Sequence, residues 1–74
     1  MVLSQVSLTQ RDGTPVTRRD AASAMARRLN PRAFEAEPVQ PEVGVWLVEL
    51  PPLLRHAESF SITFETFHVE GDKP

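Results

Sequence analysis

The chain has 74 residues, of which 41% are hydrophobic and 24% charged, with a formal net charge of −2, seven prolines and no cysteine. This length predicts one small domain covering residues 1–74 and excludes a two-domain enzyme. The lack of cysteine excludes disulfides, zinc sites with thiolate ligands and cysteine nucleophiles.

Charge is distributed unevenly along the chain. Residues 1–32 carry six arginines against two aspartates, a net charge of +4, whereas residues 33–74 carry one arginine and one lysine against eight acids, a net charge of −6. A basic half can face nucleic acid, but basic and acidic halves can also neutralise each other within one chain or between two. We favour neutralisation and keep nucleic acid as the alternative.

The first elements that we expect are a strand and a tight turn. Residues 2–9 alternate loosely between apolar and polar side chains, which predicts a strand with one drier face. Asp12-Gly13 is a strong hairpin signal. The returning arm, residues 14–16, contains Pro15, which cannot donate to a ladder, so we expect this arm at an edge.

A helix is expected over residues 18–29. Thr17 and Asp20 have the spacing of a capping box, and Asn30-Pro31 ends the helical pattern. One face is apolar but consists mainly of alanine, so it can approach a sheet closely while burying little area. The residues of this face are Ala22, Met25, Ala26 and Leu29.

Residues 30–42 form a proline-rich connector, in which we expect Phe34 to attach the loop to the core. A strand over residues 43–50 follows, and it is apolar on both faces, which is typical of a strand that is covered on both sides. Val43, Val45 and Leu47 lie on one face, and Trp46, Val48 and Leu50 on the other.

The last strand is expected over residues 60–70, and its apolar phase changes along the way. Phe60, Ile62 and Phe64 share one face, whereas Phe67 and Val69 belong to the other. Such a change predicts a bulge near residues 65–66 or a strand end that is buried on its opposite side. We expect residues 71–74 to be a frayed tail.

Few residues are candidates for catalysis or ligand binding. His56 and His68 are the only histidines, and His68 shares a strand face with Glu70, but a surface position is the favoured interpretation of this pair. Gly-x-Ser-x-Gly is absent, and three glycines do not build a phosphate-binding loop. We therefore expect no enzyme, metal site, cofactor or small-molecule substrate.

Residues 20–34, DAASAMARRLNPRAF, resemble the first helix and turn of a helix-turn-helix, as in small winged-helix excisionases. The resemblance implies a small DNA-binding regulator, with the later strands as its wing. Glu35 and Glu37 depart from the pattern, because acidic side chains on the second helix would be repelled by phosphates. The anion-binding or nucleic-acid-binding residues of this alternative are Arg19, Arg27, Arg28 and Arg32.

The fold that these patterns favour is a small α+β domain: a β-hairpin, one helix and two further strands, with the helix on one face of a three- or four-stranded sheet. The longest apolar stretch, residues 43–50, is too short to span a membrane, and the first residues lack the positive charge of a signal peptide. We expect a cytoplasmic protein that is not attached to a membrane.

One helix covers only one face of such a sheet, so a second apolar face calls for a partner. The alternative is that the proline-rich connector folds over this face and covers it with Phe34 and Val39. The predicted function is a non-catalytic protein-binding or regulatory module that works through protein–protein contacts, as a homodimer or with another protein. The predicted interface consists of Trp46, Val48, Leu50, Phe67 and Val69.

Overall fold

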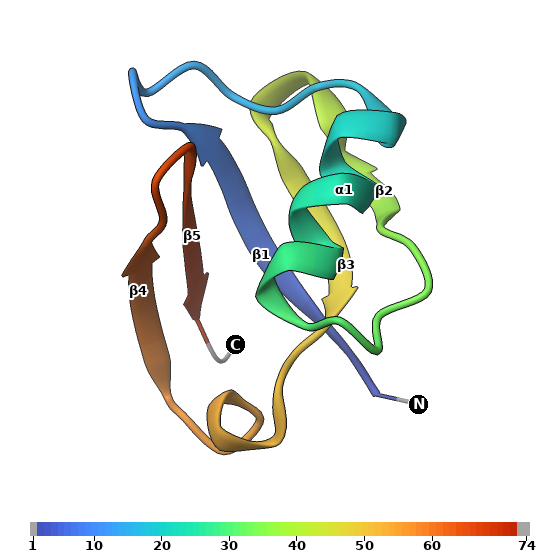
Figure 1. The fold of residues 1–74 in the computed structure, drawn as a ribbon, viewed down its shortest axis with the longest axis vertical. Helices are drawn as coiled ribbons and strands as arrows, with labels where there is room; N and C mark the ends of the chain where they lie inside the picture. Colours follow the sequence, from blue (N-terminus) through green and yellow to red (C-terminus); the bar gives the residue numbers. More distant parts are fainter. Residues whose placement is uncertain (1, 73–74) are drawn as a thin grey trace.

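A computed structural model describes residues 2–72, and over this range the chain forms one sheet and one α-helix (Figure 1). The sheet has five strands in the order β2-β3-β1-β5-β4, and all neighbours are antiparallel. The α+β fold is thus confirmed, but the expectation of three or four strands is wrong. The elements are β1 (Leu3–Gln10), α1 (Arg19–Leu29), β2 (Glu37–Gln40), the 3₁₀ turn η1 (Pro41–Val43), β3 (Val45–Glu49), the 3₁₀ turn η2 (Pro52–Leu54), β4 (Ser59–Thr63) and β5 (Phe67–Asp72).

The turn after β1 forms at the expected place. Gly13 has a φ of 91°, and Asp12 Oδ1 accepts a hydrogen bond from the Thr14 N–H at 2.9 Å. This backbone donor lowers the pKa of Asp12. The returning arm is not a strand: it contributes one antiparallel bridge, between Thr9 and Pro15. Proline lacks the N–H with which a longer ladder would continue.

The helix begins one residue later than expected, and its start is different from the predicted capping box. The N-cap residue is Arg18, which makes no side-chain capping bond, so the assignment of Thr17 as the cap is wrong. The C-terminal end matches the prediction, because the Asn30 N–H donates to the Ala26 carbonyl at 2.8 Å. Within the described residues, the helix is too short to cross a membrane.

The expected last strand is in fact a hairpin. β4 and β5 are joined by a turn closed by the Phe64 N–H, which donates to the Phe67 carbonyl at 2.7 Å. The rings of Phe64 and Phe67 stack with their centroids 4.4 Å apart. The change of apolar phase at residues 65–66 therefore marks a reversal of chain direction, after which both strands place their apolar residues on the same sheet face.

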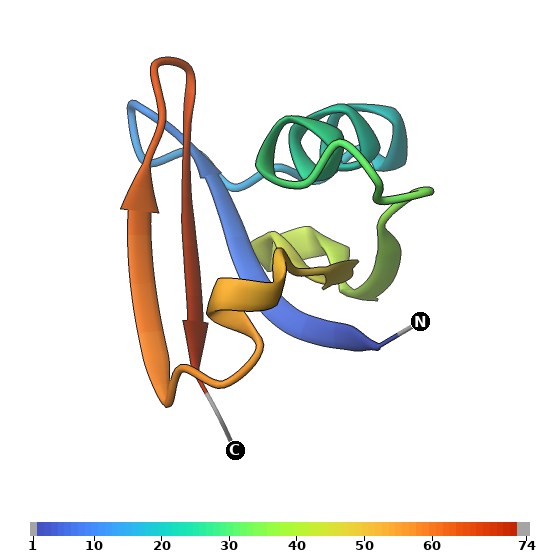
Figure 2. The same ribbon diagram turned by 60° about the horizontal axis from the view of Figure 1, so that its bottom comes forward.

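The core lies between α1 and the sheet face below it (Figure 2). Trp46 is 1% exposed, and its indole N–H donates to the Val16 carbonyl at 2.8 Å. Val6 pairs with Trp46 and Leu8 with Val69, so the central strands place their bulky residues on this one face. The side of β3 that α1 covers is therefore the side of Trp46, and the opposite side, with Val45 and Leu47, is half-buried and has no helix over it.

The connector over residues 30–42 contributes to the sheet, although it was expected to have no strand. β2 lies within it and pairs with β3. Ala33 and Ala36 are buried, whereas Phe34 is 70% exposed, so the expectation that Phe34 attaches the loop to the core is wrong. The frayed tail also needs correction: β5 extends to Asp72, while residues 73–74 lie outside the described residues.

Candidate interaction edge and open sheet face

The two edges of the sheet differ in how they are protected. β2 carries Glu37 and Pro38, and its register with β3 shifts between Pro38 and Gln40. Proline, charge and irregular pairing are the features that natural edge strands use to prevent further pairing. β4, the other edge, has the sequence SFSIT, with no charge and no proline, and pairs with β5 without a register shift.

Backbone groups of β4 alternate between β5 and the outer side of the sheet. Because the Phe64 N–H bonds to Phe67, this pair belongs to the hydrogen-bonded positions of the hairpin. Ile62 opposite Val69 and Phe60 opposite Gly71 follow at intervals of two. The N–H and C=O groups of the intervening residues point away from β5, and these residues are Ser59, Ser61 and Thr63.

The outer side of β4 has no segment of the described chain beside it. Figures 1 and 2 both show β4 at the margin of the molecule, with β5 on its inner side only. Phe60 and Ile62 lie on the α1 side of the sheet, partly buried against the core. The Phe60 ring lies over Gly71, where an added Cβ would collide with it. The edge is therefore uncharged, half apolar and open.

The face opposite α1 carries a cluster around His68. Thr63 Oγ1 lies 2.7 Å from His68 Nδ1, whereas Glu70 Oε1 and Ser61 Oγ lie 3.0 and 3.1 Å from Nε2. A carboxylate only accepts hydrogen bonds, so in the neutral ring we infer that Nε2 carries the proton and that Nδ1 accepts from the Thr63 hydroxyl. The cluster links β4 to β5 through side chains.

Chemically, this cluster fits a structural link better than catalysis. Ser61 and Glu70 meet the same ring nitrogen, so the imidazole cannot pass a proton between them. Thr63 and Glu70 do occupy opposite nitrogens, but the Glu70 side chain is 63% exposed, and its contact with His68 is the one bond that holds it among the described residues. No group of three or more potential metal ligands occurs among the described residues.

A shallow hollow adjoins the cluster at the centre of the open face. Its lining includes Gln5, Ser7, Val45 and Glu70, where Ser7 is paired with Val45 on one side and with Glu70 on the other. A small side chain between two larger neighbours produces the depression. It has one charged group and no buried polar atom that lacks a partner, so it has the character of an ordinary sheet surface.

The structure places all five residues of the predicted interface in the core of this chain. Each is at most 2% exposed, and they lie on the face that α1 covers: Trp46, Val48, Leu50, Phe67 and Val69. The expectation that these residues form a second, uncovered face is therefore wrong. Sequence alone shows that β3 has two apolar faces, but it does not show which one the helix covers.

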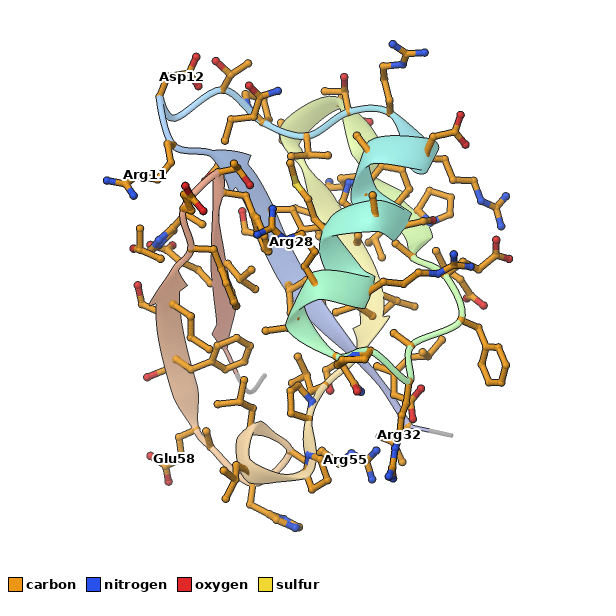
Figure 3. All side chains as sticks on the ribbon, in the orientation of Figure 1. Arg11, Asp12, Arg28, Arg32, Arg55 and Glu58 are labelled. Atoms are coloured by element: carbon orange, nitrogen blue, oxygen red, sulfur yellow. The ribbon has the colours of Figure 1, made fainter. Side chains whose placement is uncertain are left out.

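The arginines of the nucleic-acid alternative are engaged in different places. Arg19 pairs with Glu35 at 2.9 Å, and Arg27 donates to the Phe34 carbonyl at 2.9 and 3.1 Å. Arg28 reaches Thr66 in the β4–β5 turn at 3.2 Å, while Arg32 lies at the lower end of the molecule in Figure 3, away from Arg28. The structure does not bring these four side chains together into one basic surface.

The comparisons with known proteins give no further guidance, because no protein family, curated protein or solved structure matches the chain.

The open edge at β4 was not predicted from the sequence. Two signals were present: the change of apolar phase that marked the hairpin, and a strand of alternating serine, threonine and apolar residues without a protecting charge or proline.

Proposed function

We propose that this protein is a non-catalytic protein-binding module that adds an extended strand of a partner to β4. The observation that carries the proposal is the contrast between the two sheet edges. β2 has a proline, a charge and a register shift, whereas β4 presents outward N–H and C=O groups at Ser59, Ser61 and Thr63 with none of these protections. Strand addition to an exposed edge is a recurrent mode of peptide recognition.

The side chains of β4 support the same proposal. Main-chain hydrogen bonds supply affinity in this mode, and alternate side chains supply specificity. Phe60 and Ile62 are partly buried, so a partner strand beside them would remove their remaining apolar surface from water. On the opposite face, the hydroxyl groups of Ser61 and Thr63 contact the His68 ring. These hydroxyl groups would lie beside the side chains of an added partner strand on that face.

Site-directed photo-crosslinking tests the proposal. The chain has no cysteine, so Ser59→Cys on β4 and Val39→Cys on β2 each give one attachment point for a photoreactive probe. In an extract of the native host, we expect protein adducts from position 59, with another protein or with a second copy of the chain, and far fewer from position 39. Position 39 is the matched control at the protected edge. No adducts at position 59, or equal adducts at both positions, would refute the assignment of β4 as the binding edge.

A further inference from the structure

We infer that the strand that pairs with β4 is β4 of a second copy of this chain, so that two five-stranded sheets join into one continuous sheet. This inference rests on the proposed function, because it uses the same open edge. β4 is complementary to itself in one antiparallel alignment.

The outward backbone groups determine that alignment. Ser59, Ser61 and Thr63 point away from β5, so a second strand bonds to all three only if these positions face one another. An antiparallel pair centred on Ser61 places Ser61 opposite Ser61 of the second copy, and Ser59 opposite its Thr63. Each such pair exchanges two N–H···O bonds, and no outward group of β4 is then left unpaired. An alignment shifted by two residues would leave one position of each strand without a partner.

The same register brings apolar side chains together on the α1 side. Phe60 faces Ile62 of the second copy, and Ile62 faces its Phe60. These are non-hydrogen-bonded positions, in which Cα atoms approach to about 4.5 Å and side chains make their closest contacts. Both residues are partly buried in the single chain and packed against its core. The second copy would therefore extend an existing core.

Positions 59 and 63 give the register a testable signature. In the alignment centred on Ser61, Ser59 of each copy faces Thr63 of the other copy, once at each end of the pair. Both residues are exposed, and residues that face each other across two strands lie on the same sheet face. Charges introduced at these two positions would therefore meet only in this register.

The first arm of the test removes one outward N–H. Ser61→Pro deletes the N–H at the centre of the alignment but leaves the bonds between β4 and β5, because proline is tolerated where its nitrogen faces away from the sheet. Ser61→Ala is the matched control, since it shortens the side chain and keeps the N–H. In sedimentation experiments from about 1 μM to about 1 mM, we expect wild type and Ser61→Ala to form dimers and Ser61→Pro to remain monomeric with an unchanged circular dichroism spectrum.

The second arm tests the register at constant net charge. Ser59→Glu combined with Thr63→Lys places opposite charges face to face at both ends of the pair, so we expect dimer affinity to rise about three- to tenfold at low salt. Ser59→Glu combined with Ser61→Lys has the same net charge but places two ammonium groups opposite each other at the centre, so it should lower the affinity. If Ser61→Pro fails to fold, this arm decides alone, because all three positions are exposed.

The outcomes separate this inference from the proposed function. A wild type that is monomeric at about 1 mM, or a dimer that is unaffected by both Ser61→Pro and the paired charge substitutions at positions 59, 61 and 63, overturns self-pairing. If position 59 then still forms crosslinks to another protein, the proposed function stands and only the identity of the occupant is wrong. If position 59 forms none, both fail.

Discussion

Gly44 is the position where the structure makes the sharpest prediction of a destabilising substitution. Its φ is 77° and its ψ 22°, which is the left-handed region that alanine adopts only at a cost of about 1–2 kcal/mol. An added Cβ would lie 2.5 Å from the Leu8 carbonyl oxygen, 3.1 Å from Pro15 Cβ and 3.2 Å from the Val16 nitrogen.

These neighbours have little freedom to move. The Leu8 N–H donates to the Gly44 carbonyl at 2.8 Å, and the Leu8 carbonyl accepts from the Val16 N–H at 2.9 Å. The methyl group therefore displaces hydrogen-bonded backbone, which adds about 1–3 kcal/mol. The expected loss for Gly44→Ala is about 2–5 kcal/mol in the free energy of unfolding.

Gly13→Ala is the matched control, because Gly13 also has a positive φ, 91°, but an added Cβ there meets nothing within 4 Å. It retains the backbone strain and lacks the collision, so we expect a loss of about 1 kcal/mol. Urea and thermal unfolding followed by circular dichroism measure both variants, and each kcal/mol corresponds to about 4–8 °C in Tm. Equal losses for the two variants would show that the packing around Gly44 is not as described.

Three further predictions concern other parts of the fold. Thr17→Ala should leave Tm nearly unchanged, because Thr17 is not the N-cap residue. Arg18→Asp puts a hydrogen-bond acceptor at the N-cap and should stabilise the fold by about 1 kcal/mol. A loss of about 1 kcal/mol for Thr17→Ala would show instead that Thr17 caps the helix. Trp46→Phe should cost about 2–4 kcal/mol in urea unfolding, because it leaves the buried Val16 carbonyl unpaired and a cavity behind; a loss below about 1 kcal/mol would contradict this. The pKa of Asp12 is lowered in the folded state, so its stabilising effect is present above about pH 4 and disappears as pH falls through the folded pKa. The stability difference between wild type and Asp12→Asn should shrink accordingly in acid, and a difference independent of pH would exclude this origin.

Local features of the chain were predicted where local interactions determine them. The helix over residues 19–29 and its end at Asn30 follow from apolar periodicity and from a residue pair that stops a helix. The turn at Asp12-Gly13 follows from the positive φ that glycine adopts without strain. The turn between β4 and β5 has no glycine, proline, asparagine or aspartate in residues 64–67, so only the apolar phase marked it.

The candidate site depended on information that residue patterns do not contain. The sequence determined that residues 45–49 form a strand with two apolar faces and that residues 59–63 lack a protecting charge or proline. Only the tertiary structure decided that α1 covers the Trp46 side and that β4 is the outermost strand. Strand order and the choice of the covered face arise from pairings between segments far apart in the sequence, such as β1 with both β3 and β5. Periodicity within one segment places side chains on one face or the other, but only the packing of all segments together decides which face is buried and which edge remains open.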